Sequence, residues 1–198
     1  MKYIKLLAIV LSLFNWGCKE GNNMNAVYYV NYFEDEDERA LITAILKGDA
    51  NAINQFAIKK VNLDCIGEHG VTPLRVAIRI NNPSVLEQLL SLGANPNFRT
   101  PSGTVAAKFA VENKDSVYTE LLLQSGLDPN IEHGDRPILF YALDNQRWSQ
   151  FDRLVEHGAN ALTAKTGNNT TVAIMLSSMF EYERLKKHIL AGGDFETK

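Results

Sequence analysis

The sequence has few of the features that mark enzymes, membrane-embedded proteins or nucleic-acid-binding proteins. It contains only two cysteines, Cys18 and Cys65, too few for a disulfide framework. Its net charge of −3 argues against nucleic acid as a partner, because phosphate binding requires clustered lysine and arginine. The hydrophobic content of 45% is ordinary for a folded protein, and 198 residues allow one domain with short extensions.

Recognised catalytic motifs are also missing. The sequence has no phosphate-binding loop, zinc-protease helix motif or nucleophile elbow. Cys65, His69 and His133 lack paired zinc-ligand spacing, and a Cys–His pair here has no third group to orient it. We therefore expect a protein that is not an enzyme, with no metal, cofactor or small-molecule substrate. A hydrolase that uses Cys65 is the competing hypothesis, and retained activity in Cys65→Ser would dismiss it.

The N-terminal segment, 1–17, has the pattern of an export signal. Two lysines are followed by an apolar run over 6–14, which is shorter than the roughly 20 residues needed to span a bilayer. The segment ends at Gly17-Cys18 and resembles a bacterial lipoprotein signal, although Asn15 stands where that family usually has leucine. The resemblance implies that 1–17 are removed and that Cys18 is lipidated, which anchors the protein to the envelope membrane in the bacterial periplasm. Secretion without lipid and an ordinary buried N-terminal helix are the alternatives.

Two landmarks recur along the rest of the chain with the same spacing. One is a glycine followed by a small or apolar residue and then Asn or Asp, and the other is an alanine within an apolar helical segment. Successive copies of each landmark are separated by about 33 residues, a period typical of repeat architectures. Because the alanine precedes its glycine by the same interval each time, the two landmarks keep one phase and indicate an internal repeat. The landmarks are Gly93, Gly126 and Gly158, and Ala77, Ala110 and Ala142.

The residues of the clearest repeat predict two short helices. Thr72 is suited to N-cap a helix, and Pro73 is suited to its first position, where a missing N–H costs nothing. We expect this helix to continue through Ile80 and to end at an Asn-Asn-Pro break. A second helix is predicted over 84–92, and Gly93 ends it.

This pattern resembles the ankyrin repeat, through Thr72-Pro73-Leu74 and Gly93-Ala94-Asn95-Pro96-Asn97. The resemblance implies an all-α ankyrin-repeat solenoid of about five helix-turn-helix units with β-turn fingers, covering 37–198. Its last unit is marked by Gly192-Gly193-Asp194. Such units share one core by stacking.

Residues 18–36 are expected to form a polar tether and an N-terminal packing segment. The acidic run over 34–38 is interpreted as the solvated first turn of a helix, where negative charge is favoured. The aromatic residues before it, Tyr28, Tyr29, Tyr32 and Phe33, are expected to pack over the end of the first repeat rather than to form a ligand site.

The ankyrin resemblance implies a protein partner that contacts the finger tips and the concave face of the inner helices. The candidates on the fingers are Val71, Arg99, Ser102, Thr104, Glu132, His133 and Arg136. The candidates on the inner helices are Arg75, Arg79, Glu112, Asn113, Phe140, Asp144 and Asn145.

Three positions depart from the ankyrin pattern. The family usually has histidine where Arg75, Lys108 and Phe140 stand, so we expect these positions to lose a structural hydrogen bond and to become free for partner contacts. Arg75, Arg79 and Arg99 are expected in one region of the stack. Because arginine is enriched in interface hot spots, an acidic patch on the partner is predicted to face them.

The combination of export, lipid anchor and small ankyrin stack looks like that of bacterial ankyrin lipoproteins. Several of these are similar to immunity proteins against lipase-type effectors delivered between bacteria by type VI secretion. The resemblance implies a periplasmic protein that binds and inhibits a toxic phospholipase by steric occlusion. The alternative is a general envelope scaffold for protein interactions with no toxin partner.

Overall fold

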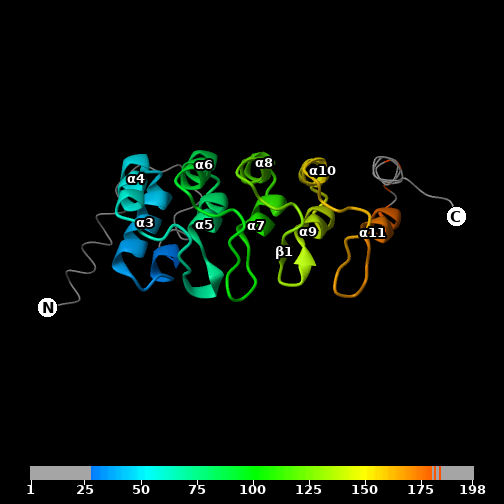
Figure 1. Ribbon diagram of the computed structural model, residues 1–198, viewed down its shortest axis with the longest axis horizontal. Coiled ribbons are helices and arrows are strands. Elements are labelled where there is room, and N and C mark those ends of the chain that lie inside the picture. Colours follow the sequence, from blue (N-terminus) through cyan, green and yellow to red (C-terminus); the bar gives the residue numbers. More distant parts are fainter. Residues whose placement is uncertain (1–27, 180, 182, 184–198) are drawn as a thin grey trace.

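The fold is a single row of stacked helical units. The computed structural model describes residues 28–179, 181 and 183. The signal-like segment, Cys18 and the last repeat landmark lie outside the described residues. Figure 1 shows an inner row of helices, α3, α5, α7, α9 and α11, beside an outer row, α4, α6, α8 and α10, with extended loops projecting below the inner row.

Each unit consists of one inner and one outer helix. This arrangement confirms the all-α ankyrin-repeat solenoid, with the inner helix and the finger of a fifth unit within the described range. Units 1 and 2 contain α3 (Glu36–Lys47) with α4 (Ala50–Ile58), and α5 (Pro73–Arg79) with α6 (Pro83–Ser91). Units 3 and 4 contain α7 (Ala106–Glu112) with α8 (Val117–Gln124), and α9 (Ile138–Asp144) with α10 (Trp148–Glu156), and unit 5 begins with α11 (Val172–Ser178).

The helix boundaries follow from local chemistry. The Thr72 hydroxyl accepts a hydrogen bond from the Arg75 N–H at 3.4 Å, so it caps α5 as predicted. Pro83, which we expected to lie in a break, is instead the first residue of α6, because proline is also tolerated at the first helical position. Gly93 follows α6 with φ of 98°, a left-handed conformation that suits glycine at a helix end.

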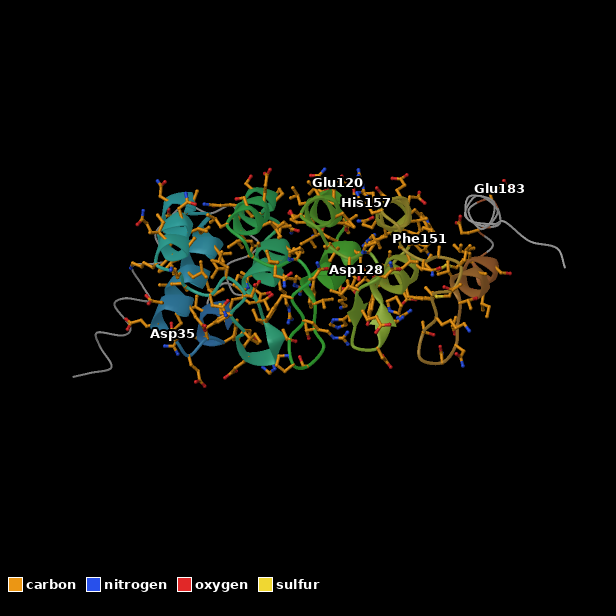
Figure 2. The ribbon with its side chains drawn as sticks, viewed as in Figure 1. Asp35, Glu120, Asp128, Phe151, His157 and Glu183 are labelled. Carbon is orange, nitrogen blue, oxygen red and sulfur yellow. The ribbon has the colours of Figure 1, made fainter. Side chains whose placement is uncertain are left out.

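The hydrophobic core runs along the stack between the two helix rows. Its largest fully buried side chains include Phe33, Phe140 and Phe151, and Figure 2 labels Phe151, which belongs to α10. Glu120 and His157 lie on the outer-helix side of the same view. Since each unit contacts only its neighbours, the core is assembled by stacking.

The loops between units are joined by a repeated side-chain hydrogen bond, which we call the loop ladder. In each step, an Asp or Asn side chain at the base of one finger accepts a hydrogen bond from the backbone N–H of the Asn or Asp that stands two residues after the next landmark glycine. The steps are Asp64 to the Asn95 N–H at 3.0 Å, Asn97 to the Asp128 N–H at 2.7 Å, and Asn130 to the Asn160 N–H at 2.8 Å. Asn97 and Asn130 also donate to the carbonyl oxygens of Gly126 and Gly158.

The fingers are short antiparallel turns. In unit 4 the finger forms strands β1 (Glu132–His133) and β2 (Arg136–Pro137), paired antiparallel. The fingers of units 2, 3 and 5 have one bridge each, Gly67 with Val71, Arg99 with Val105, and Lys165 with Thr171. The finger of unit 2 also contains a short 3-10 turn, Glu68–Gly70.

The segment before α3 occupies the place of a finger in unit 1 (Figure 1). The Glu68 N–H donates to the Tyr32 carbonyl oxygen at 2.7 Å. A Cβ on Gly67 would lie 2.8 Å from this oxygen and 2.9 Å from the Phe33 ring, so only glycine fits at this contact. Phe33 is buried, whereas Tyr29 and Tyr32 line the side of the stack that carries the fingers.

We predict that the loop ladder stabilises the fold. Asn97→Ala removes the acceptor for the Asp128 N–H and the donor to the Gly126 carbonyl, so it should lower the free energy of unfolding by about 1–3 kcal/mol. Urea denaturation of the wild type and the variant measures this change. The matched control is Asn51→Ala, on the exposed face of α4. An Asn97→Ala loss within about 0.5 kcal/mol of the control would contradict the prediction.

Candidate protein-binding groove

Cations and aromatic rings alternate along the junction between the fingers and the inner helices of units 2 to 4. We call this set the cation–aromatic row. The Arg75 guanidinium lies 4.3 Å from the centre of the Phe109 ring. The row contains Arg75, Phe109, Lys108, Tyr141 and Arg136, with Lys108 Nζ 4.8 Å from Phe109 and 5.6 Å from Tyr141, and the Arg136 guanidinium 4.9 Å from Tyr141.

Two of these cations are also paired with carboxylates. Lys108 Nζ lies 2.8 Å from Glu112 Oε2, and an Arg136 Nη1 lies 2.6 Å from Asp144 Oδ2. Cation–π contacts at exposed sites contribute about 0.5–1 kcal/mol each. Because ring and ion-pair contacts hold the long side chains, little side-chain entropy remains to be lost when a partner binds.

His133 lies at the centre of the row. Its Nδ1 accepts the Val105 N–H at 3.3 Å, and its ring is 5.6 Å from the Tyr141 ring, edge to face. Burial lowers the pKa of His133 below its ordinary value, and nearby cations, Lys108 first, lower it further. The histidine predicted as a partner contact therefore also joins the fingers of units 3 and 4 as a neutral acceptor.

Arg75 is not free, contrary to our expectation for a position that departs from the repeat pattern. Its Nη1 donates to the carbonyl oxygens of His69 and Gly70 at 3.0 and 3.3 Å. The arginine thus supplies bonds to the finger, because its length reaches backbone oxygens from α5. Burial lowers the pKa of Arg75, and the positive charge of Arg79 adds to this lowering.

The three predicted arginines lie in one electrostatic region but differ in their contacts. Arg79 is exposed on the same face of α5 as Arg75, one turn later. The Arg99 guanidinium donates to the Gly134 carbonyl oxygen of the next finger. Arg75 and Arg99 both lower the pKa of His133, so both lie within its electrostatic reach.

Two predicted partner contacts are wrong, because their side chains are inside the protein. Phe140, a residue of α9, is fully buried in the core, since an aromatic ring at this position gains more free energy from burial than from exposure. Val71 is 1% exposed and lies below the finger, where it pairs with Gly67.

The predicted finger-tip residues remain at the surface. Glu132 and Ser102 are exposed. The Ser102 hydroxyl is 3.0 Å from the Thr100 hydroxyl and 3.3 Å from the Thr104 hydroxyl, so these groups brace the turn of the unit 3 finger. A partner could reach Glu132 and Ser102 without unfolding the finger.

The predicted amides at the far ends of the inner helices also have local roles. Asn113 Nδ2 donates to Asn81 Oδ1 at 3.0 Å and thereby links units 2 and 3. Asn145 Nδ2 donates to the Tyr141 carbonyl oxygen at 2.8 Å. Asn145 and Asp144 are exposed, so they form an accessible edge of the surface between the fingers and the inner helices.

Sequence reasoning missed the aromatic members of the row. Phe109 and Tyr141 each follow directly after a position that departs from the repeat pattern, and they lie one repeat apart. An aromatic residue repeated at the unit spacing was the available signal. Tyr29 and Tyr32 gave no such signal, because they precede the repeats.

The structure also bears on the hypothesis of catalysis by Cys65. Its thiol is 2% exposed, and burial raises its pKa to about 12. A thiolate is the reactive form of cysteine, so this thiol is unsuited to be a nucleophile. The ring of His69 instead packs edge to face against the ring of Tyr32, with the ring centres 5.3 Å apart.

Over the described residues there is no cluster of metal-ligating side chains. None of the described helices is long and apolar enough to cross a membrane.

Comparisons with known proteins agree with the fold. Residues 69–101, the unit whose caps and landmarks were clearest, match the family described as Ankyrin repeat. Together with the stacked helix pairs and fingers of the structure, this match identifies the fold as an ankyrin-repeat domain. Ankyrin repeats imply a protein-interaction module.

Similar curated proteins include Protein PhlB of Serratia liquefaciens, 30% identical over 104 residues, which cover 52% of this chain and 45% of that protein. A putative ankyrin repeat-containing protein of Treponema pallidum (strain Nichols) is 31% identical over 93 residues, 46% of this chain and 31% of that protein. The putative ankyrin repeat protein FPV031 of fowlpox virus is 29% identical over 103 residues, 50% of this chain and 30% of that protein. The chain thus spans less than half the length of these relatives.

We predict that His133 makes stability depend on pH. Its pKa is lowered by folding, so the unfolded chain binds the proton more readily, and stability should fall as the pH drops through the unfolded value near 6.5. Thermal unfolding of the wild type and His133→Asn between pH 7.5 and 5.5 tests this. The asparagine oxygen can accept the Val105 N–H and does not titrate, so the variant should lose less stability over this range. Equal losses would contradict the assignment.

Proposed function

We propose that this protein is a non-enzymatic binding module that holds a protein partner in the groove between its fingers and inner helices. The cation–aromatic row is the observation that carries this proposal. Aromatic and arginine side chains are enriched in interface hot spots, and here they are held in place before a partner arrives. The exposed residues around the row, Arg79, Ser102, Glu132, Asp144 and Asn145, form a polar rim.

We further propose that the partner is a toxic phospholipase-type effector and that binding blocks access to its active site. The support is the resemblance of the signal and repeats to bacterial ankyrin lipoproteins. Steric occlusion needs no chemistry from this chain, in keeping with the buried Cys65 thiol. It does need a standard-sized interface, about 800 Å² on each partner, and a groove across several units offers a continuous surface for one.

This role requires the protein to be in the periplasm with a lipid on Cys18. The support is the basic start, the short apolar run and the Gly17-Cys18 end of the signal-like segment. A general envelope scaffold would use the same groove and the same anchor. The two functions differ in their genes, because an immunity gene lies beside its toxin gene and the neighbouring reading frame should then encode a lipase-like protein.

Charge reversal in the groove tests the binding module. Arg79→Glu with Arg99→Glu should weaken partner binding at least about tenfold, because an acidic partner surface would meet like charge. The tagged chain captures partners from lysate of the source strain, mass spectrometry identifies them, and affinities are then measured with the purified partner. Lys60→Glu, in the loop after outer helix α4, is the matched control. Unchanged affinity in the double variant would refute the groove as the interface.

The identity of the captured partner separates the finer proposals. A stoichiometric lipase-like protein that is inactive in the complex and active when released would support the immunity role. Another stable partner that depends on the same arginines would support the scaffold instead.

Metabolic labelling tests the anchor. We expect a chain grown with an alkyne fatty acid to incorporate the label, and Cys18→Ser to lose it, because the acylated residue is the first cysteine of the mature protein. Cys65→Ser, which removes the buried thiol, should keep the label. Equal labelling of the wild type and Cys18→Ser would rule out lipidation at this cysteine.

A further inference from the structure

The charges of unit 2 differ from those of the units that follow. In units 3 and 4, a carboxylate at the end of the inner helix pairs with a cation of the row: Glu112 with Lys108 and Asp144 with Arg136. The position equivalent to Glu112 in unit 2, one repeat earlier, is Arg79. Lys108 and Glu112 attract each other at i and i+4, whereas Arg75 and Arg79 at the same spacing repel.

Arg75 therefore carries a positive charge without a protein anion. The structure has no carboxylate within ion-pair distance of it over the described residues. Its Nη1 is held by the carbonyl oxygens of His69 and Gly70, and its face lies over the Phe109 ring. Its Nε is buried and has no hydrogen-bond partner in this part of the chain. A partly desolvated cation with unused donor capacity is unfavourable unless an anion is supplied.

An open hollow adjoins this guanidinium. Its volume is about 300 Å³, and it is lined by Tyr28, Tyr29, Tyr32, His69, Val71 and Arg75. We call this hollow the tyrosine pocket. The ring centre of Tyr32 lies 6.2 Å from that of Tyr29 and 5.3 Å from that of His69, both edge to face, so the three rings form one wall of the hollow. Tyrosine presents an apolar ring together with a hydroxyl that can donate a hydrogen bond.

We propose that the tyrosine pocket binds an acidic side chain of the protein partner, with its carboxylate paired to Arg75, which lines the pocket, and attracted by the positive charge of Arg79 one helical turn away. The partner would supply the anion that units 3 and 4 contain themselves. A guanidinium favours a carboxylate because its planar donors match the two oxygens. The tyrosine rings would pack against the apolar residues that flank the acid. This inference rests on the proposed function, in that the ligand is a segment of a protein.

A pair of matched peptides tests the pocket without the natural partner. The probes are fluorescein-labelled Ala-Glu-Phe-Ala and Ala-Gln-Phe-Ala, with blocked C-termini, titrated with the full-length chain and followed by fluorescence anisotropy. We expect the glutamate peptide to bind about tenfold more tightly than the glutamine peptide, and this difference to shrink at high salt. Equal binding of the two peptides, or no binding of either, overturns the proposal.

Arg79→Glu is the decisive variant. It gives unit 2 the arrangement of unit 3, so the new carboxylate should pair with Arg75, abolish the preference for the glutamate peptide and raise the melting temperature by about 2 °C. Lys60→Glu makes the same charge change away from the pocket and should alter neither property. A preference that persists in Arg79→Glu overturns the proposal.

Tyr28→Ala provides a second, independent variant. Tyr28 is 60% exposed, so its removal should leave the fold intact, and we expect it to weaken the glutamate peptide severalfold. Unchanged peptide affinity in this variant would contradict a role for the tyrosine wall.

If the pocket fails these tests while Arg99→Glu still weakens binding of the purified partner, the binding-module function stands without the pocket. If the peptides discriminate while Arg99→Glu leaves the affinity for the purified partner unchanged, the pocket stands and the groove assignment fails.

Discussion

The hydrogen bond from each loop to the side chain of the preceding loop is the constraint on which the rest of the structure depends. It fixes the distance and the orientation between neighbouring fingers, because one short side chain must meet one backbone N–H. Helix packing alone would allow small shifts between units, since apolar contacts are not directional. With the loops in register, side chains from separate units meet, and Arg75 of unit 2 can lie over Phe109 of unit 3.

The groove that results is uneven along its length. In units 3 and 4 the cations of the cation–aromatic row, Lys108 and Arg136, are paired with carboxylates of the same unit, so they are stable without a partner. Unit 2 has two arginines, Arg75 and Arg79, that form no ion pair with any described residue, and Arg75 lies beside the tyrosine pocket. If this surface binds a partner as we propose, its middle would serve mainly as a rigid platform, and its N-terminal end would attract an anionic ligand most strongly.

The sequence was sufficient to predict the repeat, its paired helices and, to within one residue, the helix ends of unit 2. These depend on local features, such as Thr72 before Pro73 and Gly93 after the second helix, that act within a few residues.

The site was less predictable. Phe140 and Arg75 both replace a usual histidine, yet one is buried and the other bonds to the finger, because their outcome depends on packing with neighbouring units. The N-terminal tyrosines were expected to pack over the end of the first repeat, and their place beside the finger of unit 2 could not be predicted for a similar cause. They have no repeat partner, and their place is fixed by long-range contacts, above all the approach of Tyr32 to Gly67. The charge difference of unit 2, in contrast, was visible in the sequence once the units were aligned on their landmarks. It gained meaning only when the structure paired Glu112 with Lys108.

The place of these tyrosines also limits how far the first unit can lie from a membrane that holds Cys18. Tyr28 comes ten residues after Cys18, and ten residues of extended chain span at most about 35 Å. If Cys18 is lipidated as we propose, the first unit stays within that reach of the bilayer surface, with the later units free to extend outward. A partner would then be captured close to the lipid, where an enzyme that attacks phospholipids must work.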